Sequence, residues 1–116
     1  MDNFTRAYIE CALWSSTDDD GEPLDSVYSI DDLSKGALEN MQIDCADFQS
    51  SFGAQYRVAG LSDEQAGHDF WLTRNRHGAG FWDRGIGDSG EALTDAAHAY
   101  GSVDLYVGDD GLIYIA

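Results

Sequence analysis

Histidine, aspartate and arginine residues are concentrated in one short stretch, residues 68–85, with the sequence HDFWLTRNRHGAGFWDRG. Imidazole and carboxylate groups held close together could bind zinc or act as a general acid and base. The residues that could converge for such chemistry are His68, Asp69, His77, Asp83 and Arg84. Their spacing matches no HExxH or CxxC pattern, and no serine or cysteine stands in a G-x-S-x-G setting. We therefore expect no enzyme, no metal and no cofactor, and keep a small His/Asp-dependent metal protein or enzyme as an alternative.

The same stretch has a structural interpretation that accounts for more of its residues. FWLT and GFWD are rich in strand formers and flank RNRHGA, which suits a loop, so the pattern predicts a β-hairpin. Its aromatic residues would serve as cross-strand and core anchors, and its aspartates would pair with arginines. The predicted core anchors are Phe70, Trp71, Phe81 and Trp82. A platform that stacks nucleic-acid bases is a third interpretation, which the acidic charge of the rest of the chain opposes.

Apolar periodicity and capping residues predict the elements of the first half of the chain. A helix is expected over residues 4–15, a loop over 17–26 and a longer helix over 30–52. Ser29 is the expected N-cap of the longer helix, since its hydroxyl can accept a backbone N–H. Gly53 is its expected end, because glycine adopts the left-handed conformation at low cost.

The second half of the chain mixes helical and strand patterns. A short helical turn is expected over 61–67 and a helix over 89–101. Residues 103–116, VDLYVGDDGLIYIA, alternate in polarity around the turn sequence GDDG and predict a second hairpin.

These elements predict an α+β fold, in which a four-stranded antiparallel sheet made of two hairpins packs against about three helices. A length of 116 residues fits a single domain. Within it, residues 1–60 would form an acidic helical half and residues 61–116 a hairpin–helix–hairpin half.

Cysteine usage and the N-terminal sequence bear on the compartment. Cys11 and Cys45 both fall in helical patterns, where we expect small buried side chains, and the sequence leaves a disulfide between them open. The N-terminal sequence has no pattern of a signal peptide, and no stretch approaches the length of a membrane span. We therefore expect a cytoplasmic protein that does not bind membranes.

Acidic residues dominate the charge of this protein. It has 22 acidic residues against six Lys and Arg, and a net charge of −16. Residues 67–87 are the one segment with more bases than acids. Such a surface repels nucleic acids and membranes and attracts basic proteins, including those that hold DNA or RNA. The alternative is a surface that serves only high solubility or salt tolerance.

Carboxylates fixed at intervals on a folded surface can imitate the phosphates of DNA, which carry about one charge per 1.7 Å of duplex axis. The rival interpretation of the loop over 17–26, a calcium site, fails because the EF-hand pattern requires a glycine where Pro23 stands. We predict instead that ten acidic residues contact a basic partner, with the seven between residues 18 and 32 contributing most. They are Asp18, Asp19, Asp20, Glu22, Asp25, Asp31, Asp32, Glu39, Asp44 and Asp47.

The motif HDFWLTRN-x-HGAGFWDRG, followed by GEALTDAAHAYG and DLYVGDDGLIYIA, resembles a family of small uncharacterised proteins encoded by bacteriophages and mobile elements. The resemblance covers residues 61–116 and carries no catalytic residues with it. It implies a setting in an infected bacterium, where small, strongly acidic phage proteins often inhibit host defence as DNA mimics.

Charge and resemblance together lead to one expected function. The protein would be a phage-encoded inhibitor, an anti-CRISPR or anti-restriction protein in the cytoplasm of the infected host. Its partner would be the basic surface of a DNA-binding defence protein, a CRISPR–Cas effector or a restriction enzyme, and it would not bind nucleic acid directly. A structural or regulatory phage accessory protein, in which Trp14 or the aromatic hairpin forms an interface, is a further alternative.

Overall fold

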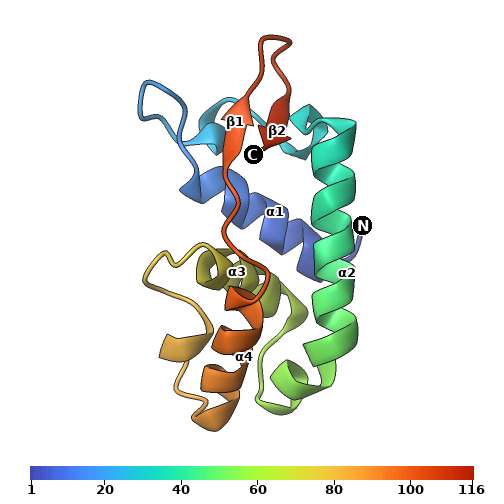
Figure 1. The fold of residues 1–116 in the computed structure, drawn as a ribbon, viewed down its shortest axis with the longest axis vertical. Coiled ribbons are helices and arrows are strands. Elements are labelled where there is room, and N and C mark those ends of the chain that lie inside the picture. The colour runs from blue at the N-terminus through green and yellow to red at the C-terminus, as the bar shows by residue number, and fades with distance from the viewer.

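Helices make up most of the fold in the computed structural model, which describes residues 1–116 (Figure 1). The only sheet is a two-stranded antiparallel one, so the predicted four-stranded sheet with two hairpins is wrong. None of the helices combines the length and the hydropathy that a membrane span needs. The elements are α1 (Asn3–Ser15), η1 (Leu24–Ser26), η2 (Ile30–Asp32), α2 (Lys35–Val58), α3 (Asp63–Arg74), η3 (Phe81–Asp83), α4 (Asp88–His98), β1 (Leu105–Val107) and β2 (Ile113–Ile115), where η marks a 3-10 turn.

The hairpin predicted within residues 68–85 is replaced by the helix α3 and the turn η3. Ser62 begins α3, because its hydroxyl accepts the backbone N–H of Gln65 at 3.1 Å. The helix lies in the middle of the molecule and packs against α1, α2 and α4, so the FWLT residues are buried whichever way they point. The half of α3 that is buried on every side, residues 69–74, lacks the one-sided apolar stripe that identifies surface helices, which is why FWLT resembles a strand.

Two corrections concern the ends of α2. The chain over residues 30–34 is not yet α-helical: Ser29 caps only the short turn η2, and Ser34 caps α2 through the N–H of Ala37 at 3.1 Å. At the other end, Gly53 does not stop the helix, which continues for five more residues to Val58. Gly53 is buried and keeps a helical backbone, since its φ is not positive. The nearest atoms to a Cβ built there belong to the exposed Arg57 side chain, at 3.0 Å, so this glycine marks neither a helix end nor a close contact between elements.

Glycine at position 67 sets the distance between α1 and α3. A Cβ built there would lie 2.1 Å from the carbonyl oxygen of Phe4 in α1. The two helices therefore touch at a point that only glycine allows. This contact supports the most extensive helix pair in the molecule.

One cluster of 22 buried apolar residues forms the core and draws on both halves of the chain. Its centre is aromatic: the rings of Phe48 and Phe70 stack with centroids 4.3 Å apart, and the ring of Phe81 lies 5.7 Å from that of Phe48. Phe70, Trp71 and Phe81 are almost completely buried. Trp82, expected to be a core anchor, is 57% exposed. In a 3-10 turn successive side chains point about a third of a circle apart, so Phe81 faces inward and Trp82 outward.

The C-terminal hairpin is present as predicted. Leu105, Tyr106 and Val107 pair with Ile115, Tyr114 and Ile113, and Leu33 adds a parallel bridge to Ile113. In Figure 1 the tip of this hairpin and the loop that follows α1 project from the same end of the molecule, whereas α4 lies at the other end. This arrangement decides which acidic residues can act together.

Candidate functional site

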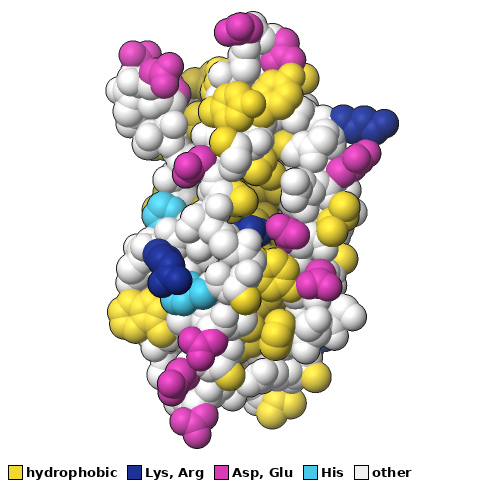
Figure 2. Space-filling model, viewed as in Figure 1, with side chains coloured by type: hydrophobic (Ala, Val, Ile, Leu, Met, Phe, Trp, Pro, Cys, Tyr) yellow, Lys and Arg dark blue, Asp and Glu magenta, His cyan; other side chains and the backbone are white.

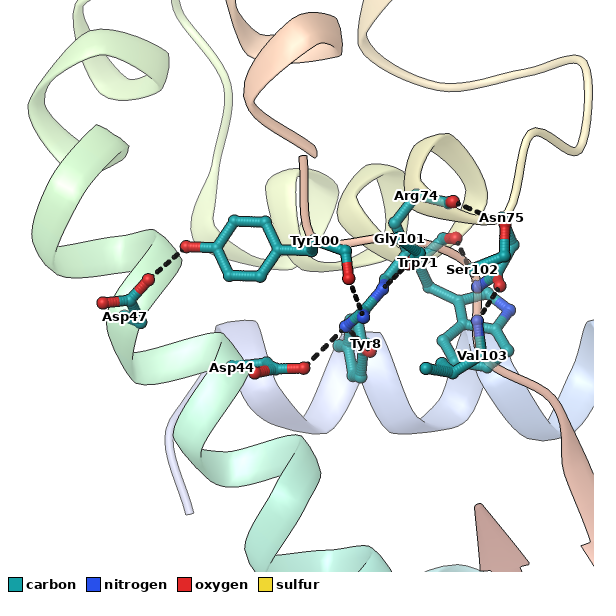
Figure 3. Close-up of polar contacts among 10 residues, drawn as sticks. All are labelled: Tyr8, Asp44, Asp47, Trp71, Arg74, Asn75, Tyr100, Gly101, Ser102 and Val103. Carbon is teal, nitrogen blue, oxygen red and sulfur yellow. Dashed lines mark hydrogen bonds and ion pairs between the residues drawn. The ribbon is translucent and has the colours of Figure 1, made fainter. Parts of the chain in front are cut away.

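Arg74, at the end of α3, is the centre of the largest polar network in the core (Figure 3). Its guanidinium donates to the Tyr8 hydroxyl at 3.0 Å, to Asp44 Oδ2 at 2.8 Å and to the carbonyl oxygens of Tyr100 and Gly101 at 3.1 and 2.9 Å. The arginine side chain is 2% exposed. A buried cation is tolerated only when it is paired and fully hydrogen-bonded, as Arg74 is here.

The network joins four segments that are distant in the sequence. Tyr8 belongs to α1, Asp44 to α2, Arg74 to α3, and Tyr100 to the segment between α4 and β1. Next to it, Asn75 accepts the backbone N–H of Val103 at 2.9 Å. Figure 3 shows these side chains converging from the four segments. Arg74 and Asn75 therefore hold the helical part of the fold to the chain that leads into the hairpin.

Asp69 and Arg84 form a second ion pair, in which the carboxylate is buried and the guanidinium is 32% exposed. Asp69 is completely buried, and its two carboxylate oxygens accept from Nε and Nη2 of Arg84 at 2.9 and 2.7 Å. Gln65 donates to the same carboxylate at 3.0 Å. His68 lies beside it, but its Nδ1 is 3.7 Å from Asp69 Oδ1 and has no hydrogen-bond partner. The bidentate pair fixes the loop that carries η3 against α3.

Of the five residues considered for catalysis or metal binding, the fold brings His68, Asp69 and Arg84 together in one cluster. Asp69 is occupied by Arg84, and Asp83 accepts the backbone N–H of Gly80 at 3.1 Å. His77 is exposed after the end of α3. No group of three or more His, Cys, Asp or Glu side chains is placed to hold a metal ion. Most of the motif thus positions α3 and η3.

The ten acidic residues predicted to contact a partner fall into two groups. Four are hydrogen-bonded within the chain: Asp44 to Arg74, Asp47 to the Tyr100 hydroxyl, and Asp18 and Asp32 to backbone N–H groups of their own turns. The other six side chains are exposed and have no hydrogen-bond or ion-pair partner. They are Asp19, Asp20, Glu22, Asp25, Asp31 and Glu39.

Asp18 orders the acidic loop that follows α1. Its Oδ1 accepts the backbone N–H groups of Asp20 and Glu22 at 2.9 and 3.0 Å. An aspartate that bonds its own backbone two residues on is typical of a tight turn. The turn leaves the carboxylates of Asp19, Asp20 and Glu22 pointing outward, so Asp18 positions these residues.

The structure adds acidic residues that the sequence did not indicate as partner contacts. Asp109 and Asp110 lie at the tip of the C-terminal hairpin, at the same end as the acidic loop. Figure 2 shows acidic side chains on both projections, with exposed apolar side chains beside the hairpin tip. A shallow cavity of about 280 Å³ lies between the loop and β1 and is lined by Asp18, Asp19 and Tyr106. We call this end of the molecule, residues 18–22 and 108–111, the acidic end. The GDDG turn signal located the hairpin tip, but only the fold places it beside the loop.

Few of the carboxylates have a basic partner. The ion pairs with arginine are Asp44–Arg74, Asp63–Arg57 and Asp69–Arg84. The other nineteen of the 22 acidic residues have none. Two of the six bases are used inside the fold, so they do not neutralise the surface.

A second hollow lies between α1 and α3, with a volume of about 570 Å³. It is lined by the indole of Trp14, which is 58% exposed, and by the side chains of His68, Glu10 and Glu64. Sequence analysis did not single out Glu10 or Glu64. The available signal was the outward stripe of α1, in which Glu10 and Trp14 are one turn apart on the face opposite the core.

Burial controls the titration of several groups near these sites. Cys11 and Cys45 are both free and buried. Burial raises the pKa of the Cys11 thiol to about 12 and also raises that of Cys45, so neither is a reactive thiolate near neutral pH. Burial and the hydrogen bond to Asp47 raise the pKa of Tyr100. These groups belong to the frame rather than to a site of chemistry.

Comparison with known proteins identifies no matching protein family, curated protein or solved structure. The chemistry of the surface therefore carries the functional argument. What distinguishes this surface is a set of carboxylates that are unpaired, exposed and held on ordered turns. Such a surface can bind a cationic partner by charge.

Proposed function

We propose that this protein is a stoichiometric inhibitor of a bacterial defence complex, a CRISPR–Cas effector or a restriction enzyme. Its acidic surface would occupy the basic surface with which that complex holds DNA. The single observation that carries the proposal is the number of carboxylates without any basic partner, nineteen of 22. The reason for proposing a defence complex as the partner is the resemblance to phage-encoded proteins that the sequence motif suggests.

The arrangement of the carboxylates at the acidic end supports a DNA mimic. Solubility needs only a net charge, spread anywhere on the protein. Here the loop and the hairpin tip hold Asp19, Asp20, Asp109 and Asp110 at one end of the molecule, on ordered turns. Carboxylates fixed close together at the acidic end can satisfy several arginine and lysine side chains at once.

The mechanism would begin with electrostatic steering and end with occupation of the DNA site. Opposite charges raise the association rate, and this effect weakens as salt screens the surface. Phosphate-binding arginines would then meet carboxylates, which accept hydrogen bonds in the same planar, bidentate manner. The inhibitor would block DNA binding without any chemical step, so one inhibitor molecule would be needed for each effector.

Charge reversal at the acidic end tests this proposal. The test variant carries Asp19→Lys and Asp20→Lys, two exposed residues with no side-chain partner. The control carries Glu91→Lys and Asp95→Lys on α4, at the other end of the molecule. This control changes the net charge by the same amount as the test variant. Tagged proteins would be used to capture defence effectors from cells that contain CRISPR–Cas and restriction systems, with unfolding midpoints measured for all three.

We expect the wild type and the α4 control to retain a DNA-binding effector, and the loop variant to retain at least about tenfold less. Capture should also decline as salt is raised. Equal capture by both variants would refute the assignment of the acidic end. Capture of no DNA-binding protein at low salt would refute the proposed function.

A further inference from the structure

We propose that the cavity between α1 and α3 is a socket for an arginine side chain of the partner. The inference rests on the proposed function, because it takes the partner to be a protein with a basic surface. The socket is defined by the Trp14 and His68 rings and by the carboxylates of Glu10, Asp25 and Glu64, all of which line the same hollow of about 570 Å³.

Trp14 provides the aromatic wall of the socket. Its indole is 58% exposed although it belongs to a helix whose other large apolar residues are buried. The ring of His68 lies beside it, with centroids 6.3 Å apart and planes inclined by 32°. Tryptophan is the aromatic residue that attracts cations most strongly through its ring face. An exposed tryptophan set in a hollow is therefore suited to hold a cation.

The charge around this wall favours a cation. Glu10, Asp25 and Glu64 line the hollow, and none of them has a hydrogen-bond or ion-pair partner among the side chains. The one arginine in the lining, Arg84, is already bound by both oxygens of the buried Asp69. The hollow thus keeps three uncompensated negative charges around an aromatic face. A cation entering it would contact both.

The imidazole of His68 lines the hollow, and its Nδ1 is buried beside Asp69. Its Nδ1 is the only buried side-chain nitrogen or oxygen atom in the protein that lacks a hydrogen-bond partner. The neighbouring Asp69 is too far away for a hydrogen bond, at 3.7 Å, and is taken by Arg84 and Gln65. A buried polar atom without a partner is rare and calls for an explanation. No hydrogen bond to Nδ1 fixes the imidazole, whose side chain is 38% exposed and lines the hollow beside Trp14.

Arginine suits the socket better than lysine, and a protein suits it better than a free small cation. The planar guanidinium can stack on Trp14 while its five N–H groups reach carboxylates in several directions, which an ammonium group cannot do. Glu10 and Asp25 also line a neighbouring hollow of about 840 Å³ whose walls include Ile30 and Leu38. The two hollows form a continuous surface on which the backbone next to an arginine could rest.

Nuclear magnetic resonance can test the socket on the isolated protein. The probe is a short peptide with one arginine between glycines, compared with the same peptide carrying citrulline, which keeps the shape but not the charge. The indole N–H signals of Trp14 and Trp82 are followed during titration. Trp82 is an internal control because it is 57% exposed but does not line the hollow.

We expect the arginine peptide to shift the Trp14 indole signal saturably and to leave the Trp82 signal nearly unchanged, while the citrulline peptide shifts neither. Trp14→Ala should weaken peptide binding by about fivefold, Trp14→Phe by less, and Trp82→Ala by less than twofold. Removing the three charges with Glu10→Gln, Asp25→Asn and Glu64→Gln should weaken binding by about tenfold. Unfolding midpoints show whether each variant remains folded.

Equal shifts at Trp14 and Trp82, or equal binding of the citrulline peptide, would overturn the socket. The same holds if Trp14→Ala and Trp82→Ala weaken binding equally. These outcomes are separable from the fate of the proposed function, because no effector is present in the titration. Capture of an effector with no peptide shift at Trp14 would refute the socket alone, and a peptide shift without effector capture would refute the proposed function alone.

Discussion

At the scale of single residues, the basic side chains of this acidic protein are divided between the core and the surface. Arg74 and Arg84 form ion pairs with half-buried Asp44 and buried Asp69, whereas Arg76 is exposed and has no ion pair. Arg74 also lies over the rings of Phe70 and Tyr100, at 5.5 and 5.7 Å from their centroids. These contacts give Arg74 a structural role that Arg76 does not share.

Arg74→Met should therefore destabilise the protein by about 3 kcal/mol, the lower part of the range for breaking a buried ion pair. The carbonyl oxygens of Tyr100 and Gly101 lose their donors, while Asp44, whose side chain is 26% exposed, can regain water. Arg76→Met is the control and should change the free energy of unfolding by less than about 0.5 kcal/mol. Urea denaturation of both variants measures the difference, and similar midpoints would contradict the role given to Arg74.

At the scale of elements, capping and periodicity predicted some helices well and failed where burial is symmetrical. The helix predicted over 4–15 and the C-terminal hairpin are present almost as expected. Residues 70–73 resemble a strand because residues 69–74 of α3 are all buried, so no polar face marks this half as a helix. The end of α2 differs from the prediction because Gly53 has a helical backbone and the helix continues through it to Val58. The sequence of a short segment does not show which other elements pack against it.

The candidate site also has features that local sequence predicts and features that depend on tertiary packing. The outward carboxylates of the loop over 17–23 could be recognised from composition and turn residues alone. The use of Asp44 and Asp47 inside the fold could not, since their partners Arg74 and Tyr100 lie more than 25 residues away in the sequence. The hollow formed by Trp14 and Glu64 likewise exists only once α1 and α3 are packed together.

The contact between α1 and α3 gives a prediction at this scale. Gly67→Ala should destabilise the protein by about 2 kcal/mol, because the new Cβ would lie 2.1 Å from the Phe4 carbonyl oxygen and must push the helices apart. Gly36→Ala, in the first turn of α2 with open space around it, should instead stabilise by about 0.5 kcal/mol. Thermal unfolding of the two variants provides the measurement. Two variants that shift the midpoint in the same direction would contradict this account of the packing.

At the scale of the whole molecule, a mostly helical body displays charge at its projections. The core is built from aromatic rings and encloses Asp69 and Arg74, whereas exposed carboxylates lie on the loop after α1, on the hairpin tip and on the outer faces of the helices. Their mutual repulsion lowers stability, and the packed core must offset it. This cost is understandable if the charge serves a partner that brings the opposite sign.

The most direct test of this account is a competition between the protein and DNA for one purified effector, the one that the tagged protein captures. Labelled duplex bound to the effector is titrated with wild type, with Asp19→Lys/Asp20→Lys and with Glu91→Lys/Asp95→Lys, at several salt concentrations. We predict that wild type and the α4 control displace the duplex with one-to-one stoichiometry, that displacement weakens as salt rises, and that the loop variant is at least about tenfold weaker. A stable complex containing effector, duplex and inhibitor together, or displacement that ignores both salt and the loop charges, would contradict the claim that this protein takes the place of DNA.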